Sequence, residues 1–371
     1  MVNGVVNSMW LIATTQAGLG HDVTLFLHEE PTTRARSLSE TTRLKLARSH
    51  REVAGAARSP LAKMRQPDVV HFHSVFIPSH ATLAVSLRHR HIPYVVTPHG
   101  GLSKQVLSRH SALKHLYAAS IEKTRIRGAS VVTAVHEKEV AEITRFLGHR
   151  APAIRVVSNP IDAALFGTES WAPTPPPFRL VFLGRYDVWH KGLDRLVALA
   201  QHLPEVQIRL HGAAPDPDDP DFKQVVRNAP ANISINGPVY GTSKIDVLKS
   251  AAMYIQLSRW EGQSISLGEA LYLGVPVAVS ADMNMATDVR DNDLGLVLPD
   301  DPARAADDIR RALGDEARRK QSSANAATFA RRRYDPEAVA EAYVHVYESV
   351  TDRAGSGNAT GLADGETGSS K

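Results

Sequence analysis

Short apolar runs alternate with longer amphipathic stretches through the first half of the chain. We predict buried strands at residues 22–27, 69–73, 94–97, 130–134 and 154–157. Between them, apolar residues recur three or four positions apart and predict helices at residues 80–89, 112–127 and 137–147. Strands that alternate with helices are typical of βαβ units and a parallel sheet.

The same alternation restarts after a proline-rich stretch, Trp171 to Pro177. The later strands are predicted at residues 179–183, 207–211, 233–236, 254–257, 275–279 and 294–298, and the helices at residues 193–201, 244–250, 266–273 and 303–313. We therefore predict two doubly wound α/β domains that face a central cleft. The predicted divisions are a domain at 1–165, a hinge or spacer at 166–178, a domain at 179–330, a closing helix at 331–351 and a disordered tail at 352–371.

Composition narrows the class of protein. The chain has 371 residues, of which 43% are hydrophobic and 22% charged, and this excludes a disordered or fibrous chain. No apolar run reaches the roughly 18 residues that span a bilayer, and the start does not resemble a secretory signal. Cysteine is absent, which excludes disulfides, thiolate metal sites and cysteine nucleophiles and favours the cytoplasm.

Charge is distributed unevenly along the chain. Residues 1–160 carry 21 Lys and Arg against 10 Asp and Glu, whereas the remainder carries 22 against 29. A basic half favours an anionic partner such as a phosphate-bearing substrate, an acidic membrane or a nucleic acid, although solvated helix faces give the same count. Aromatic residues are not interleaved with its basic residues, so nucleic acid is poorly supported.

Two motifs follow predicted strands of the second half. In the segment from Trp260 to Ala270, Glu261 and Glu269 flank small residues that lead into a helix, whose N-terminus suits a phosphate. Gly184 opens a G-R-x5-K-G string in which Arg185 and Lys191 could converge on a diphosphate. Both strings are equally compatible with ordinary turns whose charged side chains face solvent and bind no ligand.

Histidines end two predicted strands of the first half. His99, in the string TPHGG, could donate to a sugar hydroxyl or transfer a proton, and a purely structural hydrogen bond is the simpler alternative. We assign His71 and His73 to opposite faces of the sheet, and we expect no metal cluster with them.

Together these motifs resemble the family 4 retaining glycosyltransferases, also called glycosyltransferase group 1, whose two Rossmann-like domains form the GT-B architecture. The resemblance covers about residues 3–350 and includes a turn at 158–162 and an A-L-x-x-G-V-P-V string at 270–277. It implies that Arg185 and Lys191 bind the donor diphosphate. It also implies that Glu269 binds the ribose and that Glu261 stabilises the cationic transition state. His99 would contact the sugar from the opposite domain.

The resemblance further implies contacts from backbone groups. The N–H groups of Gln263, Ser264 and Ile265 would hold the sugar and phosphate, and Gly4 would lie against the phosphates. Gln263 and Ser264 stand where the family has an aromatic residue and glycine, so the sugar subsite is expected to be reshaped.

The function implied is a retaining transfer of sugar from a nucleoside diphosphate sugar to a hydroxyl acceptor, in cell-surface polysaccharide or glycolipid biosynthesis. No cofactor is expected, and the absence of an Asp-x-Asp string argues against a metal. A lipid-linked acceptor and peripheral contact with an anionic membrane at the inner face are part of this hypothesis. The alternatives are a natural-product glycosyltransferase, a GT-B sugar-nucleotide epimerase and a catalytically silent nucleotide-sugar binder.

The beginning of the chain departs from the pattern, because residues 5–20 predict a helix where a doubly wound domain opens with a strand. We expect the first strand of the N-terminal domain to be missing. In that case, either Met1 is not the natural start or the protein is a weakened member of the family, because unpaired backbone groups would loosen this domain.

Overall fold

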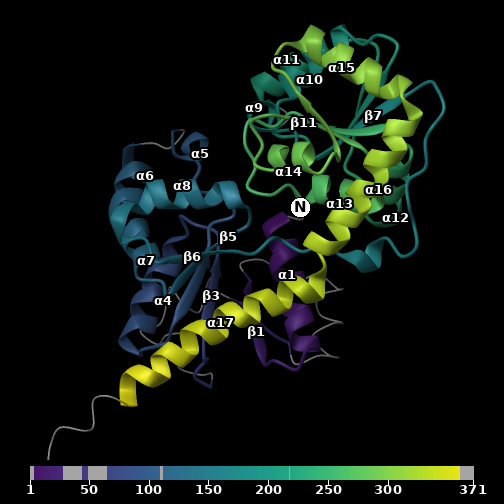
Figure 1. Ribbon diagram of the computed structural model, residues 1–371. Helices are drawn as coiled ribbons and strands as arrows, with labels where there is room; N and C mark the ends of the chain where they lie inside the picture. The colour runs from purple at the N-terminus through teal and green to yellow at the C-terminus, as the bar shows by residue number, and fades with distance from the viewer. Residues whose placement is uncertain (1–3, 28–43, 49–64, 109–111, 217, 360–371) are drawn as a thin grey trace, which may run out of the picture. The chain divides into compact units, whose positions relative to one another are not determined.

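The computed structural model describes residues 4–27, 44–48, 65–108, 112–216 and 218–359 (Figure 1). The chain divides into two compact units. Unit 1 comprises residues 1–11 and 158–336, and unit 2 comprises residues 12–157 and 337–371. The chain therefore passes from one unit to the other within its first helix, after Val157 and after Pro336.

Unit 2 is built on parallel strands that form two separate sheets. The first sheet pairs β1 (Val23–Leu27) with β2 (Leu44–Arg48). The second has the order β3 (Val70–His73), β4 (Tyr94–Thr97), β5 (Val131–Ala134) and β6 (Ala153–Val156). The helices of this unit are α1 (Gly4–Gly18, shared with unit 1), α4 (Pro78–His89), α5 (Lys104–Ser108), α6 (Ala112–Tyr117), the π-helix η2 (Ala118–Glu122), α7 (Lys123–Arg127), α8 (Glu137–Leu147) and α17 (Pro336–Ala359). Two short 3₁₀ turns, η3 (Gly148–Arg150) and η4 (Ala163–Leu165), flank β6, the second of them in unit 1.

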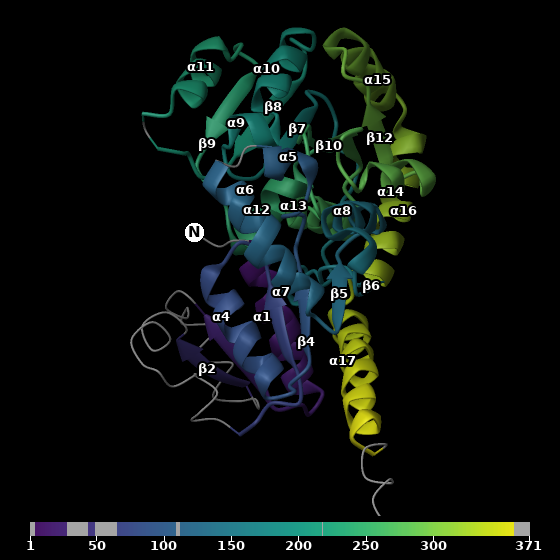
Figure 2. The ribbon, with the colours of Figure 1, turned by 90° about the vertical axis from the view of Figure 1, so that its left-hand side faces the viewer.

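Alternate residues of the four-stranded sheet pack on opposite faces, as the two-residue period of a strand requires. Val95 and Val131 lie in one cluster with Ile12 of α1 and with the apolar side of α17. Val96 and Val132 lie in the other cluster, with residues of α4, α7 and α8 (Figure 2). Both faces are covered at the two central strands, β4 and β5, which explains why these strands are buried and largely apolar.

Unit 1 contains one six-stranded parallel sheet. Its order is β12 (Gly295–Leu298), β11 (Val277–Ser280), β10 (Met253–Gln256), β7 (Arg179–Leu183), β8 (Gln207–His211) and β9 (Ile233–Asn236). Its helices are α9 (Val188–Lys191), α10 (Leu193–Gln201), α11 (Pro220–Asn228), α12 (Gly241–Lys249), α13 (Ile265–Leu273), α14 (Ala286–Asp291), α15 (Pro302–Gly314) and α16 (Glu316–Arg333).

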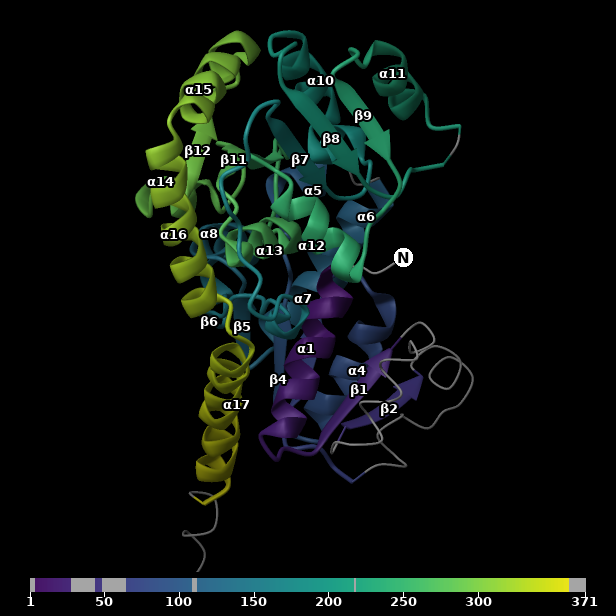
Figure 3. The ribbon, with the colours of Figure 1, turned by 90° about the vertical axis from the view of Figure 1, so that its right-hand side faces the viewer.

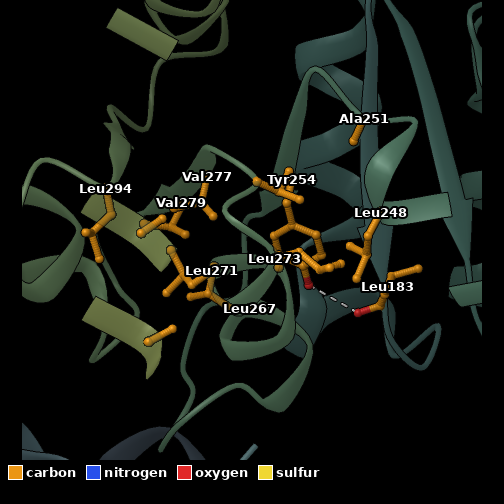
Figure 4. Packing of buried hydrophobic residues seen from close by; sticks show 14 of the residues in the cluster. Leu183, Leu248, Ala251, Tyr254, Leu267, Leu271, Leu273, Val277, Val279 and Leu294 are labelled. Atoms are coloured by element: carbon orange, nitrogen blue, oxygen red, sulfur yellow. Dashed lines mark hydrogen bonds between the residues drawn. The ribbon is translucent and has the colours of Figure 1, made fainter. Parts of the chain in front are cut away.

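Two apolar layers sandwich this sheet. Helices α12, α13 and α16 cover one face (Figure 3), and α10, α11 and α15 cover the other. In the first layer Tyr254 lies among leucines and valines, and its hydroxyl donates to the Leu183 carbonyl at 3.3 Å (Figure 4). The sheet order reverses between β7 and β10, so their carboxyl ends form the switch point at which such folds bind ligands.

Most predicted strands are found within a residue or two of their predicted bounds, but several other features differ. Strand β2 and helices α5, α9, α11, α14 and α16 were not predicted. Residues 352–359, expected in a disordered tail, continue α17, because adding turns to an existing helix costs much less than starting one. Residues 360–371 lie outside the described residues.

The proline-rich stretch is not a free spacer. Trp171 is buried in unit 1, where its indole Nε1–H donates to the Ala251 carbonyl at 2.6 Å. The passage between units lies earlier, at residues 157 and 158, and the closing helix α17 belongs to unit 2.

Helix α1 is the first element of the described chain, and no strand precedes it there. Strands β1 and β3 have no common neighbour among the described residues, so they are edges of two separate sheets. Among the described residues, none of the helices is both long and apolar enough to cross a membrane.

Candidate functional site

The carboxyl ends of β7 and β10 carry the two motifs of the second half. Gly184 and Arg185 directly follow β7, and the segment from Leu257 to Glu261 directly follows β10. These strands are hydrogen-bonded neighbours in parallel register, Met253 beside Leu180 and Tyr254 beside Val181. Both motifs therefore leave the sheet at its switch point.

The short helix α9 brings Lys191 back to the sheet. Asp187 caps this helix by accepting from the His190 N–H at 3.0 Å. Gly192 ends it in the left-handed region at φ +66°, and a Cβ at this position would lie 2.1 Å from the Leu257 carbonyl oxygen. Only glycine permits this approach, which fixes Lys191 beside the end of β10.

Lys191 and Glu261 form an ion pair, and their side chains are 13% and 10% exposed. Glu261 Oε1 also accepts from Gln256 Nε2 and from Ser258 Oγ, each at 3.0 Å. Burial alone would raise the pKa of Glu261, but the charges of Lys191 and His190 and the hydrogen bonds from Lys191 and Ser258 hold this pKa below its ordinary value. Glu261 is therefore an anion at neutral pH.

An aromatic stack supports this pair. The His190 ring lies parallel to Trp260, with centroids 4.0 Å apart, and its Nε2 is 3.0 Å from the Trp260 carbonyl oxygen. Burial lowers the pKa of His190, although Glu261, 3.6 Å away, acts in the opposite direction. The second tryptophan, Trp189, contacts Trp260 with centroids 4.9 Å apart.

The N-terminus of α13 lies beside Glu261 in the sequence. Ser264 is its N-cap and accepts from the Leu267 N–H at 3.3 Å. The Gln263 side chain accepts from the Asn159 N–H at 2.6 Å and donates to the Asn159 carbonyl at 3.0 Å, which fastens the predicted turn at 158–162 to this loop. A Cβ at Gly4 would lie 3.2 Å from Ile265 Cγ1, so the start of α1 adjoins this helix end.

Glu269 lies one turn into α13 and is 7% exposed. Lys244 of α12 donates to its Oε1 at 2.5 Å. Burial raises the pKa of Glu269 above its ordinary value despite the opposing charge of Lys244. Arg185 differs from these residues, because it is exposed and makes no hydrogen bond or ion pair with other described residues.

In unit 2, His99 belongs to a cluster of histidines. Its Nε2 lies 2.9 Å from His73 Nδ1, and the His73 ring lies 3.9 Å from that of His71, centroid to centroid. The assignment of His71 and His73 to opposite faces is therefore wrong, because residues two apart in a strand share a face. Burial lowers the pKa of His99 to about 4, so its ring is neutral at physiological pH.

The turn that carries His99 is held by a buried carboxyl group. His99 has a φ of +53°, which few non-glycine residues adopt. Glu139 Oε1 accepts from the next N–H, that of Gly100, at 2.6 Å, while its Oε2 accepts from the Val135 N–H at 2.7 Å. Burial raises the pKa of Glu139 to about 7.

The structure thus brings together Lys191 with Glu261, and Gly4 with Ile265, in unit 1. Glu269 and Arg185 lie on elements that leave the same sheet, and His99 lies in unit 2. Lys244, Gln256 and Glu139 could not be predicted from the sequence, because each meets its partner only through the tertiary structure. Among the described residues, no group of three or more His, Asp or Glu side chains is arranged to hold a metal ion.

Comparison with known proteins places this chain in a family. The sequence matches Glycosyltransferase Family 4 over residues 2–165 and Glycosyl transferases group 1 over residues 177–315. It is 29% identical over 313 residues to a phosphatidyl-myo-inositol mannosyltransferase of Mycobacterium tuberculosis, covering 78% of this chain and 75% of that protein. It is 25% identical over 310 residues to a GDP-mannose:cellobiosyl-diphosphopolyprenol alpha-mannosyltransferase of Xanthomonas oryzae, covering 79% and 78% of the two chains.

Solved structures agree with this placement at the level of the fold. Sucrose-phosphate synthase from Thermosynechococcus elongatus superposes with a TM-score of 0.72 at 18% identity over 92% of each chain. Anabaena HepE in complex with UDP and glucose gives 0.72 at 17% identity, over 94% of this chain and 96% of that one. The two α/β units are those of the GT-B architecture, and the chain belongs to the family 4 glycosyltransferases of the group 1 type.

Proposed function

We propose that this glycosyltransferase moves a sugar from a nucleoside diphosphate sugar to a hydroxyl acceptor, with retention of configuration and without a metal ion. The observation that carries the proposal is the Lys191–Glu261 pair at the switch point of the unit 1 sheet, beside the N-terminus of α13. A cation, an anion and a helix N-terminus at one place suit a reaction that separates charge.

The donor diphosphate needs positive groups that remain charged as it leaves. Arg185 is exposed and unpaired within the described structure, so its guanidinium group is available to bind two phosphate oxygens in a bidentate contact. Lys191 supplies a second positive charge, and the N–H groups of Gln263, Ser264 and Ile265 donate to no backbone carbonyl in the described residues. We propose that these groups stabilise the leaving diphosphate in place of a metal.

Glu261 is assigned to the sugar. As the bond from the anomeric carbon to the diphosphate oxygen breaks, positive charge develops on the sugar ring, and an anionic carboxylate stabilises it. The acceptor oxygen then forms its bond on the same face, and its proton passes to an oxygen of the leaving phosphate. This front-face scheme follows the family resemblance and gives retention without a protein nucleophile.

Glu269 and His99 are assigned supporting contacts. Glu269 lies inside α13 with Lys244 on one oxygen, and we propose that it binds the ribose hydroxyls of the donor. The neutral His99 ring has an Nδ1 atom that is buried and has no hydrogen-bond partner among the described residues. We propose that it binds a sugar hydroxyl.

The relatives suggest acceptors on lipids, since one is named for phosphatidyl-myo-inositol and another for a diphosphopolyprenol. Leu116 of α6 and Ile121 of η2 are 66% and 49% exposed, and such side chains can insert into a membrane surface. Residues 104–127 are rich in Lys and Arg and could attract an anionic membrane, but Arg125 is buried against Glu122, so its charge is not available. A second segment rich in Lys and Arg, residues 43–65, could contribute to the same attraction, but most of it lies outside the described residues.

We therefore propose that the protein works in the cytoplasm, at the inner face of a membrane, on a lipid-linked acceptor. Sedimentation with vesicles that contain anionic phospholipid, at low and high salt, tests this contact. Binding at low salt that Leu116→Ser and Ile121→Ser weaken would support it. Absence of binding at low salt would favour a water-soluble acceptor.

The reaction itself is tested with a panel of nucleotide sugars that includes GDP-mannose and UDP-glucose. Thermal shift identifies the donors that bind, and release of the nucleoside diphosphate in EDTA identifies those that react. NMR of the product then reports the configuration at the anomeric carbon. Inversion would refute the mechanism, and a changed sugar nucleotide formed without acceptor would indicate an epimerase.

A further inference from the structure

Gln256, the last residue of β10, is completely buried and hydrogen-bonded at both ends of its side-chain amide. Its Nε2 donates to Glu261 Oε1 at 3.0 Å and to Ser258 Oγ at 2.9 Å. Its Oε1 accepts from Ser264 Oγ at 2.8 Å and lies 3.1 Å from the Tyr254 hydroxyl oxygen. This amide therefore uses all its hydrogen-bonding groups inside the protein.

The chemistry of the partners fixes the orientation of the amide. An ionised carboxylate only accepts hydrogen bonds, so Glu261 must face the NH₂ end of Gln256. Ser258 then accepts from Gln256 and passes its own proton to Glu261 Oε1. A flipped amide would set its oxygen against the carboxylate and lose both donors.

Three donors thus converge on one oxygen of Glu261: the Lys191 ammonium group, the Gln256 amide and the Ser258 hydroxyl. The other oxygen, Oε2, has no hydrogen-bond partner among the described residues, and it is not among the buried atoms. It is therefore accessible from solvent. The protein holds the carboxylate by Oε1 and leaves Oε2 for another molecule.

The far end of Gln256 is fixed by α13. Ser264 is the N-cap of this helix, so its hydroxyl oxygen accepts from the Leu267 N–H while its proton goes to Gln256. Tyr254 is anchored in the apolar layer, and its hydroxyl lies 2.9 Å from Ser266 Oγ. Gln256 therefore links Glu261 to the start of the helix that we assign to the phosphates.

We propose that Gln256 is a positioning residue that holds the Glu261 carboxylate in the orientation that presents Oε2 to the donor sugar. This inference rests on the proposed function, because it takes the role of Glu261 as given. The geometry of the chemical step depends on it, since a displacement of about 1 Å can cost about a hundredfold in rate.

The test is Gln256→Met, which keeps the length of the side chain and removes every hydrogen bond. We expect kcat for release of nucleoside diphosphate to fall about tenfold to a hundredfold, with affinity for UDP or GDP alone within twofold of wild type. Gln207→Met is the matched control, because Gln207 lies in the same sheet with an exposed side chain that bonds only to Arg179 among described residues. If Gln256→Met does not fold, Gln256→Asn keeps the amide and shortens its reach.

A double-mutant cycle separates positioning from a general loss of stability. If Gln256 acts through Glu261, adding Gln256→Met to Glu261→Gln should cost no further activity. Full additivity would overturn the inference. Wild-type activity in Glu261→Gln would instead refute the proposed function of Glu261.

A crystal structure of the Gln256→Met variant tests the positioning without any turnover. The inference expects Glu261 to leave its present rotamer or to become disordered. An unmoved carboxylate, still bonded to Lys191 and Ser258, would overturn it even if the proposed function holds.

Discussion

Replacing Lys191 by Met should impair catalysis and change its pH dependence at the same time. The substitution keeps the length of the side chain and removes one positive charge from a pair whose members are about nine-tenths buried. Only Arg185 and the N-terminus of α13 then remain to stabilise the departing diphosphate. Loss of one preorganised donor to developing charge costs about a hundredfold to a thousandfold in kcat, or about 2.7–4 kcal/mol.

The pH effect follows from the same contact. Burial pushes the pKa of Glu261 upward, and the charge of Lys191 is the largest of the factors that lower it. Without this charge the pKa of Glu261 rises, so the acid limb of the kcat/KM profile should move to higher pH. The assay is release of nucleoside diphosphate between pH 5 and 9, with melting temperature as the check on folding.

Lys223→Met is the control for this substitution. Lys223 pairs with Asp218 at 2.8 Å, but these side chains are 53% and 91% exposed, and such surface pairs contribute about 0–1 kcal/mol. We expect wild-type kinetics from it. A Lys191→Met variant that keeps both its rate within threefold and its acid limb would refute the assigned role of the pair.

Three further predictions concern neighbouring features. Gly192→Ala should lower both melting temperature and kcat, since the left-handed backbone alone costs about 1–2 kcal/mol and the new Cβ meets Leu257; Gly314→Ala, with open space around it, is the control measured beside it. The pKa of Glu139 is about 7 in the folded protein against an ordinary 4.5, so its ionisation destabilises the fold as the pH rises between these values. The melting temperature of Glu139→Gln should therefore rise relative to that of wild type from pH 5 to pH 8. A difference in melting temperature that stays constant with pH would contradict this. His99→Ala should lower turnover less than Glu261→Ala, because His99 orients the sugar without bearing the main charge, and the reverse order of the two rates would refute that division.

Much of the fold could be predicted from the sequence because fully buried parallel strands consist of short runs of apolar residues. The strands at 94–97, 179–183, 207–211 and 233–236 have their predicted bounds. The strand at 44–48 was missed because its alternating Leu and Lys residues lie in a basic stretch that carries no continuous apolar run. The boundary between the units was misplaced because a run of prolines suggests a linker, whereas Trp171 anchors this run in the unit 1 core.

The candidate site was predictable only as far as its local strings allowed. Arg185, Lys191 and Glu261 each follow β7 or β10, so their placement at one edge of the sheet follows from topology. The residues that hold them in place did not stand out, because Gln256 is simply a polar residue at a strand end. Its significance depends on Ser264, eight residues away, and on the way β10 and α13 pack.

The most direct test of the central claim compares wild type with Glu261→Ala in release of nucleoside diphosphate from the donor that the panel identifies, with EDTA present. We predict that wild type reacts in EDTA and that Glu261→Ala is slower by at least about a hundredfold with an unchanged melting temperature. A Glu261→Ala variant that folds normally and reacts at nearly the wild-type rate would contradict the account.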